Sequence, residues 1–222
     1  MIRIRQILQT SNSPKSSLIP QILLAQVPDS VIVSDLEIGG NSEITDSSLL
    51  LTTGLGRVSG VIANNALTTT YPEYNNGWHV TAEPNGDLTE LSTNRKLYSL
   101  YWEGQQGQFE TTDEGFIVKG SEVANFLEEK LPLLGLNAYE TEEFIIYWLP
   151  IMQQNSYNYV RFATPTEIEE YMPLNITPKP DTTIRVLMVT KPLEHPITLH
   201  EQTLPDTPKR QGFTVVEWGG TK

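Results

Sequence analysis

The distribution of aromatic residues divides this chain into two unlike parts. All nine tyrosines, six phenylalanines and four tryptophans lie between Tyr71 and Trp218. Aromatic side chains bury large areas and dominate protein cores, so an N-terminal stretch without any is poorly equipped to fold alone. We therefore predict an extended N-terminal arm over residues 1–55, which docks on something else, and a globular body over residues 56–222.

The arm keeps short aliphatic runs, separated by Ser, Thr, Asn and Gly, and its polar stretch 9–17 has the composition of a flexible linker. Strand-like segments with aliphatic side chains tend to aggregate unless they are covered. The arm is therefore expected to dock on the body, on a neighbouring copy or in a larger assembly. The residues predicted to carry this docking are Arg3, Arg5, Ile22, Leu23, Leu24, Val31 and Val33.

The net charge of the chain makes some classes of binding partner unfavourable. The net charge is −12, and a surface this acidic repels phosphate groups, so nucleic acid and anionic membranes are not expected partners. No stretch approaches the roughly 20 apolar residues of a membrane span. Residues 1–15 carry three cations and no acid. This asymmetry favours attraction between copies or to another acidic protein, although a solvated terminus has the same composition.

The body has the pattern of an α+β, predominantly β, sandwich-like antiparallel domain with one or two short helices. A helix is predicted over 121–131, with Ser121 as its N-cap and Pro132 at its end, and a second helical turn after Asn137. The run Phe144–Leu149 is apolar on both faces and stops at Pro150, so we predict a core strand there. The other predicted strands cover residues 67–71, 78–82, 97–102, 116–118, 157–163, 183–189, 197–203 and 213–218.

Six blocks of the body carry a resemblance to a known family. They are YPEYNNGW (71–78), LYWEG (100–104), FIVKG (116–120), FIIYWLP (144–150), IRVLM (184–188) and GFTVVEWGG (212–220). In this order they resemble, over residues 56–220, a family of uncharacterised microbial proteins that also has a Lys-Pro-Val-Ile-Tyr-Leu-Tyr-Pro motif near the start of its domain. That motif is absent here, and the arm stands in its place. The resemblance implies a domain boundary near residue 56 and no activity.

Catalytic and metal-binding motifs are few. The sequence has no cysteine, no glycine-rich phosphate loop and no Gly-x-Ser-x-Gly. His195 and His200 are an odd number of residues apart, which on one strand places them on opposite faces, and His79 has no acid or nucleophile fixed beside it by a motif. We therefore predict neither a metal nor a cofactor.

Two carboxyl groups are candidates for a glycoside-type hydrolase. Glu103 and Glu217 each lie beside a tryptophan at the end of a predicted strand, and an apolar neighbour raises the pKa of a carboxyl group. Such hydrolases need two carboxyl groups on facing elements. The alternative is that both are ordinary solvated acids at strand ends.

Three aromatic residues form the best binding candidate. Tyr71, Tyr74 and Trp78 flank one turn, where exposed rings could stack on sugars, and core packing is the competing role.

The leading hypothesis for the whole chain is a non-enzymatic structural or interaction protein on a virion or cell surface, rather than in the cytoplasm. It would be a virus or phage particle component or a surface filament subunit that assembles with other copies through its arm. A carbohydrate-binding module and a hydrolase are the alternatives.

Overall fold

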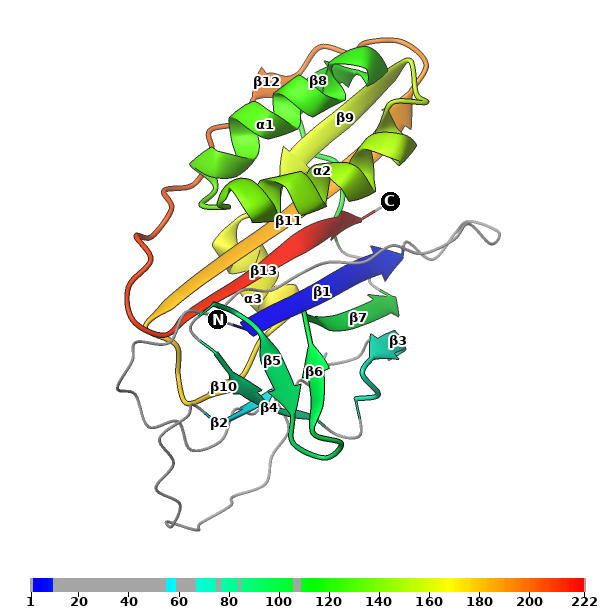
Figure 1. The fold of residues 1–222 in the computed structure, drawn as a ribbon. Coiled ribbons are helices and arrows are strands. Elements are labelled where there is room, and N and C mark those ends of the chain that lie inside the picture. Colours follow the sequence, from blue (N-terminus) through cyan, green and yellow to red (C-terminus); the bar gives the residue numbers. More distant parts are fainter. Residues whose placement is uncertain are drawn as a thin grey trace.

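The computed structural model describes residues 2–9, 55–58, 67–74, 77–83, 85–105 and 109–221 (Figure 1). These residues form an eight-stranded sheet covered on one face by two helices and on the other by a five-stranded sheet and a short helix. The predicted α+β, predominantly β class is confirmed. Each face of the large sheet has its own buried hydrophobic core.

The eight-stranded sheet combines antiparallel and parallel pairs. Neighbouring strands are antiparallel at β8–β9, β9–β11 and β3–β7, and parallel at β8–β12, β11–β13, β13–β1 and β1–β7. In spatial order the strands are β12 (His200–Glu201), β8 (Glu114–Lys119), β9 (Tyr157–Phe162), β11 (Thr182–Leu193), β13 (Thr214–Thr221), β1 (Ile2–Gln9), β7 (Leu100–Gln105) and β3 (Leu67–Tyr71).

The smaller sheet is antiparallel throughout, as predicted for the body. Residues of β4 alternate between buried and half-buried, and the buried ones pack in the same core as Leu100 and Trp102 of β7. In the turn between β4 and β5, Gly86 has a φ of 95°, a conformation that glycine adopts readily. In spatial order the strands are β10 (Ile176–Thr177), β2 (Leu55–Val58), β4 (Trp78–Ala82), β5 (Leu88–Glu90) and β6 (Arg95–Leu97).

The predicted helix over 121–131 is confirmed as α1 (Val123–Leu133), which follows a 3₁₀ turn over Gly120–Glu122. Its buried residues Val123, Leu127 and Leu131 recur every fourth position, the spacing of one helix face. The prediction of Ser121 as the N-cap was wrong, because the 3₁₀ turn moves the cap to Glu122.

The predicted core strand over Phe144–Leu149 was wrong: these residues lie within α2 (Ala138–Met152). A capping box at Asn137 and Glu140 starts the helix, and it lies outside the apolar run on which the strand prediction rested. The buried Phe144, Trp148 and Met152 follow at intervals of four residues. An apolar run this short does not distinguish a buried strand from a buried helix. The capping box upstream of the run is the sequence signal that identifies the helix.

Three further segments differ from the predicted pattern. The predicted strand 97–102 is divided, because β6 ends at Leu97 and β7 begins at Leu100. Within 197–203 only His200–Glu201 is a strand. A third helix, α3 (Pro165–Tyr171), was not predicted, although Thr164 and Glu167 form a capping box with proline at the first helical position.

The core beneath α1 and α2 is built on stacked aromatic rings. The ring of Phe144 lies 6.0 Å from that of Trp148 and 5.2 Å from that of Trp218 on β13, centroid to centroid. Gly220 leaves room for this arrangement, since a Cβ there would lie 2.6 Å from the Trp148 ring. These contacts fix α2 across β13 (Figure 1).

The capping box of α2 offers a test of the helix assignment. The variant Asn137→Ala removes the side chain that accepts the Glu140 amide, and we expect it to lower the free energy of unfolding by about 1 kcal/mol. The exposed Glu142 on the same helix is the control, and Glu142→Ala should change stability by less than about 0.5 kcal/mol. Urea denaturation followed by tryptophan fluorescence measures both. Equal effects of the two substitutions would contradict the assignment.

Candidate functional site

The first strand of the chain occupies a central position in the large sheet. β1 pairs in parallel with β13 from Ile2 to Leu8 and with β7 from Ile4 to Gln9. Arg3 and Arg5, predicted as docking residues of the arm, therefore lie within a strand of the body's own sheet. The other predicted docking residues, Ile22, Leu23, Leu24, Val31 and Val33, lie outside the described residues.

Strand order makes β1 the only link between two parts of the large sheet in the described structure. On one side lie β12, β8, β9, β11 and β13, and on the other lie β7 and β3. Without β1, the backbone groups of β13 and β7 that face it would have no partner strand. We call the space between β13 (Thr214–Thr221) and β7 (Leu100–Gln105) the β1 slot.

The two candidate acids are both buried, Glu103 to 1% exposure and Glu217 to 2%. They lie on opposite faces of the sheet, because their neighbours Trp102 and Trp218 belong to the two different cores and adjacent strand residues alternate between faces. The sheet separates the two carboxyl groups. They cannot act together on one substrate.

Glu217 is held by an arginine that the sequence analysis did not single out. Arg185 on β11 donates from Nε to Glu217 Oε2 at 2.5 Å and from Nη1 to Glu169 Oε2 at 3.4 Å. The Arg185 and Glu217 side chains are 9% and 3% exposed, whereas Glu169 is 67% exposed. Arg185 and Glu217 occupy aligned positions of the neighbouring strands β11 and β13. They are 32 residues apart in the chain, so the sequence does not show that they are in contact.

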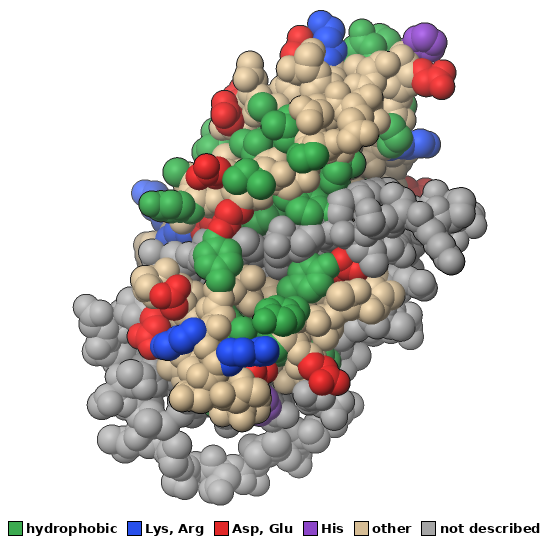
Figure 2. Space-filling view, turned by 45° about the vertical axis from the view of Figure 1, so that its right-hand side comes forward, with side chains coloured by type: hydrophobic (Ala, Val, Ile, Leu, Met, Phe, Trp, Pro, Cys, Tyr) green, Lys and Arg blue, Asp and Glu red, His purple; other side chains and the backbone are tan. Residues whose placement is uncertain are grey.

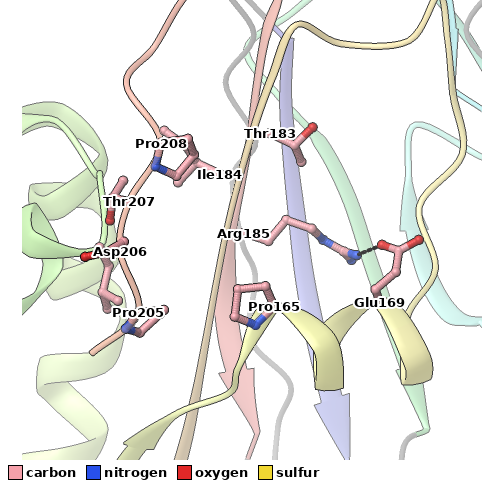
Figure 3. Close-up of a pocket in the computed structure, with 10 residues that line it drawn as sticks. Pro165, Glu169, Thr183, Ile184, Arg185, Pro205, Asp206, Thr207 and Pro208 are labelled. Carbon is pink, nitrogen blue, oxygen red and sulfur yellow. Dashed lines mark hydrogen bonds and ion pairs between the residues drawn. The ribbon is translucent and has the colours of Figure 1, made fainter. Parts of the chain in front are cut away.

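A pocket of about 320 Å³ adjoins this pair (Figure 3). Its lining comes from β11, α3 and the segment before β13. In Figure 3, Pro165 and Glu169 lie on one side of β11, and Pro205 to Pro208 lie on the other. The pocket thus has walls from both layers that cover the large sheet.

A second ion pair positions the segment whose residues 205–208 form one wall of the pocket. Arg210 donates from Nη1 to Glu140 Oε1 at 2.9 Å and from Nη2 to the Gly135 carbonyl at 2.7 Å. Glu140 is fully buried at the start of α2. Thr207 also donates to the Leu133 carbonyl. These bonds attach residues 207–210 to the helical layer, and the Thr182 hydroxyl on β11 also donates to the Lys209 carbonyl at 3.4 Å.

The start of α3 forms the opposite wall, and its capping box is charged. Burial by itself would raise the pKa of Glu167, but hydrogen bonds from Thr164 and the nearby Arg161 guanidinium outweigh it and lower the pKa. A lowered pKa means that this carboxylate stabilises the fold above its unfolded-state pKa, and that the contribution is lost as the pH falls through the folded-state value.

The predicted aromatic site is mostly part of the core. Trp78 is 3% exposed, and its Nε1 donates to the Pro72 carbonyl at 2.8 Å. Tyr74 is partly buried and meets the Trp78 ring edge-on, with centroids 5.0 Å apart. Tyr71 is 55% exposed, and the Arg95 guanidinium lies 5.3 Å from its ring centroid. The three residues therefore do not present a shared stacking surface.

The histidines are scattered over the described structure. His195 and His200 are both exposed; His200 lies in β12, and His195 lies outside any strand. His79 is half-buried on β4. No group of three or more His, Asp or Glu side chains within the described ranges could hold a metal ion. None of the helices described here is long and apolar enough to cross a membrane.

Comparisons of the chain with protein-family models, with curated proteins and with solved structures found no match. Its function must therefore be inferred from the geometry of the β1 slot and of the pocket.

The Arg185–Glu217 pair can be tested through stability. The variant Arg185→Met leaves the Glu217 carboxylate buried without its cation, and we expect it to destabilise the fold by about 3–5 kcal/mol. The double variant Arg185→Met, Glu217→Leu should recover most of the loss, because no uncompensated charge remains. Urea unfolding measures both.

The exposed pair Lys119–Glu122, with side chains 54% and 58% exposed, supplies the matched control. Lys119→Met should cost less than about 1 kcal/mol. A double variant as unstable as Arg185→Met alone would show that the arginine acts through packing and not through its charge.

Proposed function

We propose that this protein is a non-enzymatic structural or interaction protein that assembles by exchanging its N-terminal strand between copies, as a virus or phage particle component or a surface filament subunit. The observation that carries the proposal is the position of β1. It lies between β13 and β7 in the large sheet, and residues 10–54 separate it from β2, the next strand along the chain.

The β1 slot requires a strand. On its two sides, β13 and β7 offer backbone donors and acceptors along their length, and the β13 residues are all buried. A buried backbone group without a partner costs about as much as a lost hydrogen bond. Facing strand edges would also recruit other chains. Some chain must therefore supply β1, and the pairing is the same whichever copy supplies it.

The connection to β2 permits donation to another copy. A segment of this length spans more than ~100 Å when extended, at ~3.3 Å per residue. Long connections also lower the effective concentration with which a strand competes for its own slot. Exchange of an identical element between copies then has little cost in free energy and links them.

The helical layer offers a surface on which neighbouring copies could pack. Leu133 is 57% exposed, Tyr139 75% and Ile146 65%, on or beside α1 and α2. Figure 2 shows hydrophobic side chains gathered over the upper part of the molecule, where these helices lie. Exposed apolar area of this kind commonly marks a protein–protein contact. It supports an interaction role and favours neither the glycan-binding nor the hydrolase alternative.

Strand exchange can be tested by cross-linking, because the chain has no cysteine of its own. Leu8 and Thr221 are aligned neighbours of β1 and β13. Adjacent strands lie about 4.8 Å apart, within the Cα range of a disulfide. The variant Leu8→Cys, Thr221→Cys should give covalent oligomers on a non-reducing gel after oxidation. The single-cysteine variants are the controls, and cross-linked monomers alone would refute exchange.

Removal of the strand provides a second test. The sequence predicted a globular body over residues 56–222, but in the structure a variant lacking residues 1–9 would have an open β1 slot. We expect it to lose several kcal/mol of stability and to lose assembly. A synthetic peptide of residues 1–9 should restore the melting temperature but not the particle mass, since it fills the slot without linking copies. A peptide with proline in place of Ile4 and Gln6 should restore neither.

A further inference from the structure

Three consecutive residues of β11, Thr183, Ile184 and Arg185, line the same pocket. Side chains of successive strand residues point to opposite faces of a sheet, so a pocket on one face could not meet all three. This pocket must therefore run along the backbone edge of β11. Figure 3 shows the same arrangement, with lining residues from both sides of the strand.

The backbone hydrogen bonds identify which groups face the pocket. The Thr182 amide donates to the Phe213 carbonyl, on the β13 side of the strand, at 3.1 Å. Because backbone groups alternate in direction along a strand, Thr183 and Arg185 direct their amide and carbonyl groups to the opposite edge. Further along the same edge, the Leu187 carbonyl accepts from the Ala163 amide at 2.8 Å, and β9 then covers the remainder.

The edge beside Thr183 and Arg185 has no strand on it in the described structure, where β9 pairs only with Met188–Leu193. The segment that runs nearby carries prolines at 205 and 208, and proline has no amide hydrogen to donate to the strand. That segment is bonded to the helical layer through Thr207 and Arg210, and to β11 through the Thr182 hydroxyl, which donates to the Lys209 carbonyl. Among the residues that the structure describes, no strand therefore pairs with the amide and carbonyl groups of Thr183 and Arg185, which are four backbone groups that an incoming chain could bind.

We infer that this edge of β11 is a docking site for a short extended segment of a partner protein that carries a lysine or arginine side chain. Such a segment would add to the sheet in line with β9, and its backbone would pair with Thr183 and Arg185. The open stretch from Thr183 to Arg185 is about 7 Å long at ~3.3 Å per residue, so about three residues of the partner would pair. This site is separate from the β1 slot.

The charge at the pocket selects a cationic segment. The Arg185 guanidinium binds Glu217 through Nε and Glu169 through Nη1, while its Nη2 is buried without a hydrogen-bond partner among the described residues. Glu169 is 67% exposed, and Asp206 is exposed on the opposite wall, so the accessible charge is negative. Pro165, Pro205 and Pro208 supply apolar surface between these acids. A basic side chain flanked by small or β-branched residues fits this lining.

The test uses the full chain and the fluorescein-labelled peptide acetyl-Thr-Val-Lys-Val-Thr-amide, with binding followed by fluorescence anisotropy. The variant Thr183→Pro removes the amide that faces the pocket and leaves the bonds to β13 in place. We expect it to weaken binding about tenfold or more. Thr183→Val, which keeps that amide and loses only the hydroxyl, should bind within about twofold of the unmodified protein.

Two further comparisons do not depend on the folding of a proline variant. A peptide N-methylated at alternate amides cannot pair with the strand edge, and we expect it to bind about tenfold more weakly to the unmodified protein. The double variant Glu169→Gln, Asp206→Asn should weaken binding severalfold and reduce its salt dependence. A peptide with glutamate in place of lysine should not bind.

Equal binding of the methylated and unmethylated peptides would overturn strand addition. Equal binding of the lysine and glutamate peptides would overturn the charge preference. If the protein alone dimerises, and Thr183→Pro abolishes that dimer, the occupant is a second copy and the assignment to a partner protein is wrong. Because the β1 slot is untouched by Thr183→Pro, the Leu8–Thr221 cross-link pattern should be the same in this variant, which separates the two proposals.

Discussion

The pairing of β1 with β13 and β7 is the interaction on which the rest of the large sheet depends. It joins a five-stranded part of that sheet to the β7–β3 pair, and it does so through backbone hydrogen bonds in parallel register. Parallel strands must be joined by long connections, and β1 is held in the sheet by its backbone pairing with β13 and β7. This arrangement supports the proposed exchange of β1 between copies.

Two buried ion pairs organise the region around the pocket. Arg185 and Glu217 link β11 to β13 on one face, and Arg210 and Glu140 attach the segment before β13 to α2 on the other. Buried charges contribute little net stability, but the loss of one partner is costly, so such pairs constrain geometry more than they stabilise it. Both pairs lie near the pocket, and Arg210 fixes the position of the segment whose residues 205–208 form one of its walls.

Several elements followed from local patterns because their signals are local. The strand β4 and the helix α1 were predicted from alternation and from the helical spacing of apolar residues. The prediction failed for Phe144–Leu149, where an apolar run without polar alternation fits both a strand and a helix. The predicted second helical turn after Asn137 is confirmed as the start of α2, and the capping box of α3 was present in the sequence and would have located that helix as well.

The candidate site was less accessible to sequence reasoning. Glu217 was singled out for its tryptophan neighbour, but its partner Arg185 lies on another strand and is aligned with it only by sheet register. Glu103 and Glu217 looked equivalent in sequence, and only the assignment of each strand face to a core separates them. The aromatic residues Tyr74 and Trp78 sit beside a turn, and burial in the core rather than their place in the chain decides their role.

By itself, the sequence determined the class of fold, the division between an aromatic-free N-terminal part and an aromatic-rich body, and the acidic surface. These properties follow from composition and from periodicities of two and four residues, which need no long-range information. Only the tertiary structure decided that β1 lies between β13 and β7, which acids face which core, and that no strand among the described residues pairs with β11 beside Thr183 and Arg185. Those features depend on pairing between residues far apart in the chain, and strand register is set by the folded whole.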